Sequence, residues 1–319
     1  MALFLREDDI KQLLTMDLAL TSGEEAFRLL ACGQAIDIPR ERTRLPKVAQ
    51  HILQGALPTL NVIGYKHYTS SRDGVRFLVY LYDAEDGHLD AVLEGNMLGM
   101  MRTGAASGIA TKYLARPEAS VLGLFGSGWQ ATGQLRAIAA VRKLTQVKVF
   151  GRDPDRLAGF CDRMSAEVGV PVEPSVSAED TVRGSDIVTT VTTAASPLFN
   201  GDWLDAGTHI NAAGSNSLAR REIDENTLRR TRLVCVDTVP TALREAGDLL
   251  LALEKGRLHT RQLVELGDIV CGKTPGRADP QQITLFESQG LAVQDLALGV
   301  RLVALAREQG LGSKLPLAV

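Results

Sequence analysis

The order of apolar and polar residues changes along the chain and predicts two kinds of structure. Between residues 17 and 33, apolar side chains recur at helical spacing with charged side chains between them, which predicts an amphipathic helix. Between residues 60 and 91 the pattern becomes short runs rich in Val, Tyr, Ile and Phe, including Val62 to Tyr68 and Val75 to Tyr82. Because Asp-Gly pairs separate these runs, we predict antiparallel strands joined by tight turns.

An alanine-rich segment follows, from Thr103 to Leu114, and predicts a helix. Thr103 is the expected N-cap, since a threonine hydroxyl can accept a hydrogen bond from a free amide of the first turn. Pro117 lies just beyond the end of this helix and cannot continue it. We therefore expect a domain boundary near Arg116.

Beyond Pro117 the pattern alternates between apolar strands and amphipathic helices, which specifies a parallel sheet with helices on both faces. The predicted strands are Ser120–Phe125, Gln146–Phe150, Ile187–Val191, His209–Ala213 and Leu233–Val236, and the predicted helices include Ala131–Val141 and Pro154–Val168. A last helix is predicted from Leu291 to Glu308. We expect an α/β protein with a Rossmann-type, doubly wound parallel sheet over residues 117–290. An α+β domain would cover residues 1–116 and be completed by residues 291–319.

Composition narrows the possible functions. The chain has 319 residues, 45% hydrophobic and 23% charged, which indicates a globular protein with room for two cores. The net charge of -3 gives no attraction for nucleic acid or anionic membranes, and we expect neither as a partner. The charged start, the absence of a long apolar run and four widely spaced cysteines favour a cytoplasmic protein without a disulfide framework. The five histidines show no ligand spacing, so we expect no metal.

The strand that begins at Ser120 runs into a Gly-x-Gly-x-x-Ala motif and then into a helix. The first glycine permits a tight turn, the second allows pyrophosphate to approach the backbone, and the small third residue lets helix and strand pack closely. The helix N-terminus then points at the phosphates. This context predicts a nicotinamide dinucleotide site and therefore an enzyme. The expected cofactor-binding residues are Gly126, Ser127, Gly128, Trp129, Gln130 and Ala131.

The second strand of this domain ends in Gly151-Arg152-Asp153, where enzymes that use NAD usually place an acid against the ribose hydroxyls. Arg152 takes the place of that acid and could bind the 2′-phosphate of NADP(H) with two parallel hydrogen bonds. NADP(H) is therefore favoured, and NAD(H) remains possible. The alternative is that Arg152 is solvated while Asp153 caps the helix from Pro154; both can hold together.

Several blocks resemble one family, that of ornithine cyclodeaminase and mu-crystallin, which includes archaeal-type alanine dehydrogenase and bacterial ketimine reductases. They span nearly the whole chain in order. They are Arg42-Thr43-Arg44-Leu45-Pro46, Lys66, Glu94-Gly95-Asn96, Arg102-Thr103-Gly104-Ala105-Ala106-Ser107, Gly126 to Ala131, His209-Ile210-Asn211-Ala212-Ala213-Gly214, and Phe286 to Asp295.

The resemblance implies a first domain that binds substrate and forms a homodimer, a second that binds cofactor, and an active site in the cleft between them. It assigns Arg42 and Arg102 to the carboxylate of an amino or imino acid, a group that suits the planar guanidinium fork. It makes Lys66 the active-site lysine and places Thr103 with the cofactor residues. Burial would lower the pKa of Lys66 and make it a usable proton donor or acceptor near neutral pH. Alternatively, strand alternation turns Lys66 outward; we interpret its neighbour His67 as structural.

One position departs from the family pattern. After Gly214 the cyclodeaminases carry an aspartate that serves the amine of ornithine, whereas this chain has Ser215-Asn216. Asn216 cannot act as a base, although it can hydrogen-bond an amine, an imine or the nicotinamide carboxamide. It could also simply cap a turn.

We therefore expect an NAD(P)H-dependent reductase of small cyclic imino acids, which converts pyrroline-2-carboxylate or piperideine-2-carboxylate to proline or pipecolate. Three alternatives remain at this point. They are an ornithine cyclodeaminase that releases ammonia, an alanine dehydrogenase, and a protein that binds NADPH without turnover.

Overall fold

The computed structural model describes residues 2–316, and the chain divides into two compact units. Unit 1 contains the residues up to Arg102 together with those from Gly290 onward, and unit 2 contains Thr103–Gln289. The C-terminal segment thus belongs to unit 1, although unit 2 separates it from the rest of that unit along the chain. No helix among residues 2–316 combines the length and apolar character that a bilayer crossing requires.

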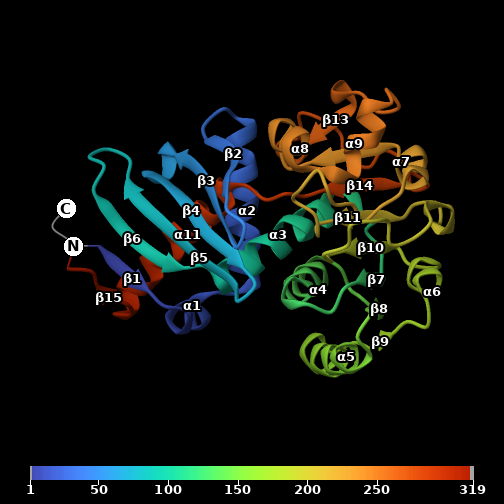
Figure 1. Ribbon diagram of the computed structural model, residues 1–319, viewed down its shortest axis with the longest axis horizontal. Coiled ribbons are helices and arrows are strands. Elements are labelled where there is room, and N and C mark those ends of the chain that lie inside the picture. The colour runs from blue at the N-terminus through green and yellow to red at the C-terminus, as the bar shows by residue number, and fades with distance from the viewer. Residues whose placement is uncertain (1, 317–319) are drawn as a thin grey trace. The chain divides into compact units, whose positions relative to one another are not determined.

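Unit 1 is built on a mixed, mainly antiparallel sheet of seven strands (Figure 1). Its strands in spatial order are β15 (Ser313–Lys314), β1 (Leu3–Leu5), β6 (Leu89–Glu94), β5 (Gly74–Asp83), β4 (Val62–Ser71), β3 (Val48–Leu57) and β2 (Ile36–Arg44). Its helices are α1 (Glu7–Leu13), α2 (Met16–Ala31) and α11 (Ala292–Gln309), with a short 3-10 turn at Pro58–Leu60. The predicted helix at 17–33 and the two predicted strands within 60–91 are present.

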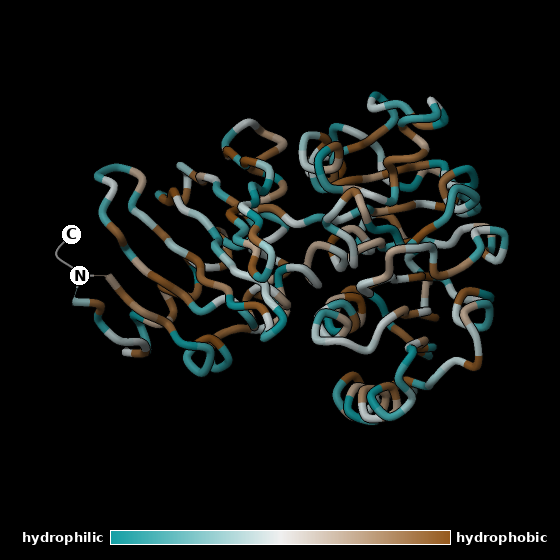
Figure 2. Tube along the Cα trace, in the orientation of Figure 1, coloured by the Kyte–Doolittle hydropathy of each residue, from teal (hydrophilic) through white to brown (hydrophobic). Residues whose placement is uncertain are grey.

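One face of this sheet is covered by α11, which contacts β3, β4 and β5, and α2 packs against α11. In β4, burial alternates residue by residue, so that Val62, Gly64, Lys66 and Tyr68 face α11. We call this the inner face and the opposite side the outer face. Figure 2 shows that the strands of unit 1 contain both hydrophobic (brown) and hydrophilic (teal) stretches.

Helix α3 (Asn96–Leu114) runs across the boundary between the units and begins earlier than the sequence predicted. Thr103 lies inside it, so the expected N-cap at Thr103 is wrong. The carboxylate of Glu7 closes the true N-terminus: it accepts hydrogen bonds from the amides of Asn96 at 2.6 Å and Met97 at 3.0 Å. Because this cap comes from a distant part of the chain, the local sequence does not reveal it.

Unit 2 contains a sheet of eight strands that are all parallel. In spatial order they are β13 (Leu263–Glu265), β12 (Leu233–Val236), β14 (Thr284–Glu287), β11 (His209–Ala212), β10 (Ile187–Thr190), β7 (Val121–Phe125), β8 (Gln146–Phe150) and β9 (Val172–Pro174). The chain moves outward from β7 to β9 and then returns to place β10 on the other side of β7. Such a reversal of strand order is where dinucleotides bind in open α/β sheets.

Helices cover both faces of this sheet, as two separate cores show. One core joins Leu122 and Leu124 to residues of α4 (Trp129–Val141) and α5 (Pro154–Val168). The other joins strand residues to α8 (Val239–Glu245) and α9 (Gly247–Glu254). The remaining helices of unit 2 are α6 (Ala178–Val182), α7 (Glu225–Arg230) and α10 (Leu266–Val270), with 3-10 turns at Gly201–Trp203 and Thr260–Gln262. The doubly wound fold expected from the sequence is confirmed.

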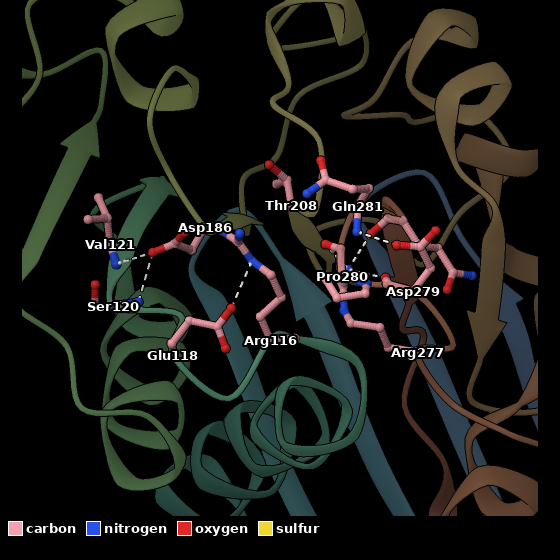
Figure 3. A network of polar contacts seen from close by, with 12 residues as sticks. Arg116, Glu118, Ser120, Val121, Asp186, Thr208, Arg277, Asp279, Pro280 and Gln281 are labelled. Atoms are coloured by element: carbon pink, nitrogen blue, oxygen red, sulfur yellow. Dashed lines mark hydrogen bonds and ion pairs between the residues drawn. The ribbon is translucent and has the colours of Figure 1, made fainter.

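At the amino ends of β7 and β10, a polar network fixes the start of the sheet (Figure 3). The Asp186 carboxylate accepts hydrogen bonds from the amides of Ser120 and Val121 at 2.8 and 3.0 Å and pairs with Arg116 at 2.5 Å. Arg142 donates to the carbonyls of Thr111 and Ala115 and so satisfies the last turn of α3. These contacts tie the end of α3 to the amino edge of the sheet.

Candidate functional site

Lys66 is buried on the inner face of the unit 1 sheet, and only 1% of its surface is exposed. The strict alternation in β4 places it in phase with Val62 and Gly64, so the alternative in which Lys66 points outward is wrong. A fully buried ammonium is costly unless it has a partner. Its Nζ donates to Oδ1 of Asp295 at 2.9 Å and lies 5.0 Å from the centre of the Phe77 ring.

Asp295 is the residue that joins Lys66 to Arg102. The same Oδ1 accepts from Nε of Arg102 at 3.1 Å, and Nη1 of Arg102 donates to Oε1 of Gln294 at 3.2 Å. Asp295 is fully buried, and its other oxygen, Oδ2, has no hydrogen-bond partner among the described residues. One carboxylate thus holds two cations side by side inside unit 1.

The electrostatic balance around Lys66 lowers its pKa to about 8, chiefly because burial disfavours the charged form. Asp295 opposes this effect by favouring the ammonium, while Arg102 and Arg40 add to it. The amine can therefore gain or lose a proton near neutral pH, as a general acid requires.

Two glycines make room for these cations. A side chain on Gly99 of α3 would meet Nζ of Lys66, and one on Gly290 would meet the guanidinium of Arg102. Gly290 also has φ of +82°, a backbone conformation that other residues rarely adopt. Both positions therefore support the close packing of Lys66 and Arg102.

Arg42 shares the inner face with Lys66. It lies opposite His51 in the ladder of β2 and β3, and His51 lies opposite Tyr68, whose ring stacks on the imidazole at 4.2 Å. Burial and the neighbouring arginines lower the pKa of His51 to about 4, so this histidine is neutral. Arg40, at an irregularity in β2, is also buried, with its guanidinium carbon 5.9 Å from the centre of the Tyr68 ring.

The loop between β7 and α4 has the geometry expected of a pyrophosphate cradle. Gly126 has φ of +113°, and a side chain there would meet the carbonyl oxygen of Val191. Gly128 is the N-cap of α4, and no side chain caps the first turn, in which the amide of Ala131 donates to the carbonyl of Gly128 at 3.1 Å. The N-terminus of α4 can therefore receive an anion. A Cβ on Gly128 would fill the open side of this loop, where the nearest atom is Nη2 of Arg156 at 3.5 Å. Residues 126–131 thus fit a dinucleotide, whereas Thr103 lies within α3, where its carbonyl accepts from Gln134 at 3.4 Å.

Around the end of β8, the structure supports the capping role that the sequence suggested for Asp153. Its Oδ1 accepts from the amide of Arg156 at 3.1 Å and so caps α5, whose first residue is Pro154. Arg152 is exposed. The guanidinium of Arg156 thus lies near the phosphate loop, and Arg152 follows Gly151, where an added Cβ would lie 3.3 Å from Oγ of Ser127.

The loops that follow β10 and β11 are joined by a buried carboxylate. Glu222 accepts from the amide of Thr192 at 2.6 Å and from that of Gly214 at 2.8 Å. Asn216 is exposed two residues beyond Gly214. The position of this asparagine thus depends on a loop that Glu222 anchors.

Glu222 belongs to a set of buried acids, with Asp248 and Glu287. Asp248 accepts from the backbone amide of Glu222 at 2.6 Å, and Glu287 accepts from the side-chain amide of Gln289 at 2.9 Å. Burial raises the pKa of Glu222 to about 7 and that of Glu287 well above its usual value. Burial and the neighbouring acids disfavour the charged form most strongly at Glu287, so Glu287 is the neutral acid of this set.

Across residues 2–316 one group could approach a metal ion, Asp83, Asp86 and His88. It lies in the turn between β5 and β6, where the oxygens of Asp83 and Asp86 already accept from turn amides. These hydrogen bonds explain why the three side chains lie close together: the acids stabilise the turn.

The structure therefore unites Lys66 and Arg102 within unit 1, puts Arg42 on their face, and places the phosphate loop, Arg152 and Asn216 in unit 2. Sequence reasoning missed Asp295, Gln294 and Arg40. Asp295 had a visible signal: it is the charged residue of the mainly apolar stretch from Leu291 to Leu298. A buried cluster of cations that includes a lysine with a pKa of about 8 has the chemistry to bind a carboxylate and to transfer a proton.

Comparison with known proteins gives the family. The sequence profile of the Ornithine cyclodeaminase/mu-crystallin family matches residues 2–307. The chain is 34% identical over 272 residues to a Delta(1)-pyrroline-2-carboxylate reductase of Bacillus cereus, which covers 85% of this chain and 83% of that protein.

Two solved structures have the same fold as this chain over nearly their full length. Thermococcus litoralis Delta(1)-pyrroline-2-carboxylate reductase, in complex with NADH and L-proline, has a TM-score of 0.94 and 32% identity, with 98% of this chain and 100% of that chain covered. An archaeal alanine dehydrogenase dimer with bound NAD has a TM-score of 0.93 and 30% identity, with 99% of both chains covered. The class is thus that of α/β enzymes that bind a nicotinamide dinucleotide. The chain belongs to the ornithine cyclodeaminase/mu-crystallin family.

Proposed function

We propose that this protein reduces the C=N bond of a small cyclic imino acid, with pyrroline-2-carboxylate as the first candidate substrate and proline as its product. The observation that carries the proposal is the buried Lys66, whose pKa is about 8, beside Arg102. The Bacillus and Thermococcus relatives, both pyrroline-2-carboxylate reductases, support this substrate class.

Each cation has a role in this reaction. Arg102, with Arg42 on the same face, binds the substrate carboxylate, and Lys66 donates the proton that the imine nitrogen acquires. When bound, NAD(P)H supplies the hydride that goes to the imine carbon, so that C=N becomes CH–NH and the cofactor leaves as NAD(P)+. Asn216 hydrogen-bonds the imine or the nicotinamide carboxamide.

The test is a substrate panel followed at the NAD(P)H absorbance. Pyrroline-2-carboxylate and piperideine-2-carboxylate should each consume cofactor, and Lys66→Met should lower kcat by about 100-fold or more. Cofactor binding, measured by fluorescence, should be retained in this variant, which separates loss of chemistry from loss of fold. No absorbance loss at saturating imine would contradict the proposal.

The same panel separates the competing activities. An ornithine cyclodeaminase would release ammonia from ornithine without net consumption of cofactor. An alanine dehydrogenase would require pyruvate and ammonia together. Asn216, in place of the cyclodeaminase aspartate, weighs against the first of these. Tight NADPH binding without any turnover would indicate a binding protein instead.

We further propose that NADP(H) is the preferred cofactor, with its 2′-phosphate bound by Arg152 and Arg156 near the phosphate loop. The solved relatives contain NADH or NAD, so NAD(H) is the competing choice. Titration of the protein with both cofactors decides between them, and Arg152→Gln should weaken NADPH binding while leaving NADH binding nearly unchanged.

We also propose that the protein is a homodimer formed through the outer face of the unit 1 sheet. We propose a cytoplasmic location as well, as expected from the sequence. That face exposes Ile36 and Ile63 at 57% and 49% and carries the stacked rings of Tyr65 and Tyr80. It also has a hollow of about 390 Å³. An exposed sheet face that carries isoleucine and tyrosine side chains among polar ones is typical of a protein interface, and the archaeal relative is a dimer.

A further inference from the structure

We infer that Asp295 is a positioning residue of the reaction, which fixes the proton donor Lys66 and the carboxylate-binding Arg102 in one geometry. The inference rests on the proposed function, in which these two side chains do the chemistry and the binding. Asp295 itself contacts neither the substrate nor the cofactor in this scheme; it acts through its two cationic partners.

The geometry is specific. One oxygen, Oδ1, accepts from Nζ of Lys66 at 2.9 Å and from Nε of Arg102 at 3.1 Å, so both cations are held to a single point. Neither the aspartate nor the lysine has more than 2% of its side chain exposed. In such an environment the aspartate charge is weakly screened and acts strongly on both partners.

The first turn of α11, which carries Asp295, is itself fixed at several points. The amide of Val293 donates to Asp37 of β2 at 3.2 Å, and the amide of Leu291 donates to the side chain of Gln294 at 3.3 Å. Gln294 also accepts from Nη1 of Arg102. Asp295 is therefore held rigidly where it meets Lys66, which is what a positioning residue requires.

The charge of Asp295 determines the pH range in which Lys66 can donate a proton. The charged groups that face Lys66 are Asp295 from α11, Arg102 from α3 and Arg40 from β2. Only Asp295 favours the ammonium; burial and both arginines disfavour it. Without the carboxylate, the pKa of Lys66 must fall below its present value of about 8, and the donor becomes deprotonated at lower pH.

The test is the pH profile of imine reduction in the full-length protein. In Asp295→Asn, the alkaline limb of kcat should move down by about 1 to 3 pH units, the range expected for loss of one close opposite charge. The KM for the imine should also rise at pH 6, because Arg102 loses an anchor. Asp295→Glu keeps the charge and should return the alkaline limb towards that of the parent enzyme.

The matched control is Glu25→Gln, which removes the ion pair of 2.5 Å between Glu25 and Arg301 that also joins α11 to the rest of unit 1. It should leave the pH profile unchanged. A fall in kcat by the same factor at every pH in Asp295→Asn, or an unmoved limb, would overturn the inference.

A second measurement keeps this result separate from the proposed function. If the parent protein reduces no imine, the proposed function fails, and the inference is then judged by the ¹³Cε NMR titration of Lys66. A lower titration midpoint in Asp295→Asn than in the parent supports the control of Lys66 by Asp295. An equal midpoint overturns it.

Discussion

At the scale of single residues, Arg102 shows that a positive charge alone does not make this site, because the directions of its hydrogen bonds also matter. Its guanidinium donates in two directions within unit 1, from Nε to Asp295 and from Nη1 to Gln294. A lysine would keep the charge but lose this fixed fork. The arrangement therefore depends on the shape of the side chain as well as on its charge.

Arg102→Lys should lower kcat/KM for the imine by roughly 30-fold to 1000-fold, equivalent to about 2 to 4 kcal/mol, mainly through a higher KM. Steady-state kinetics with the imine as the varied substrate measures the effect. Arg72→Lys, at an exposed position, is the control. A kcat/KM within twofold of the parent would show that Arg102 does not bind the carboxylate.

Glu287→Gln should stabilise the protein at alkaline pH, because glutamine mimics the neutral acid. The folded state raises the pKa of Glu287, so this group contributes stability that is present below about pH 4.5 and lost as the pH rises towards the folded pKa. At pH 8 the variant should melt higher than the parent by a few degrees, because the parent keeps a proton on Glu287 or buries its charge there. At pH 5 the difference should be small.

Thermal melts at both pH values check this expectation, and the exposed Glu173→Gln is the control. A lower Tm for Glu287→Gln at pH 8 would mean that the wild-type carboxylate is ionised there.

The apolar strand around Lys66 and the family resemblance predicted its burial, whereas strand alternation alone left an outward orientation open; the structure buries it. The partner of Lys66 could not be found in this way, because Asp295 is 229 positions away and no local pattern links the two. The same applies to the buried set of Asp248 and Glu287, which lie on α9 and β14 and meet only in the folded chain.

At the scale of elements, most of the predicted strands and helices of unit 2 lie within one or two residues of their predicted ends, and α5 has the predicted bounds. Strong alternation and the Gly-rich turn specify these elements locally. The start of α3 was predicted seven residues too late, at Thr103 and not at Asn96. The helix is capped by Glu7, which lies 89 positions away in the sequence. The first residues of α3 are rich in Met and Gly and lack a local capping residue pattern, so the sequence did not mark its start.

Glu7→Gln should therefore destabilise the protein by about 1 kcal/mol, because the helix loses a charged cap that accepts from two amides. The expected fall in Tm is roughly 2 to 4 °C. Asp8→Asn, on the same helix but paired only with the exposed Lys11, should change the Tm very little. Equal effects of both substitutions would argue against a specific cap.

At the scale of the whole molecule, the outer face of the unit 1 sheet is the feature that bears on assembly. Ile63→Lys would place a charge in the middle of the proposed interface and should convert the dimer to a monomer, as measured by light scattering after gel filtration. Lysine is costly there because its charge would be desolvated without a partner. Val176→Lys, at a residue of unit 2 that is 91% exposed, should leave the mass unchanged. A parent protein that is monomeric at micromolar concentration would contradict the proposed dimer.

The interrupted course of unit 1 along the chain has a consequence for biosynthesis. A ribosome delivers the strands that carry Lys66 first, then the whole of Thr103–Gln289, and only afterwards the segment with α11. Unit 2 can thus complete its core while the half-made sheet still lacks the helix that covers its apolar face and the carboxylate that neutralises its lysine. The nascent chain is exposed to aggregation until translation has passed Asp295, and chaperone demand should be concentrated in that interval.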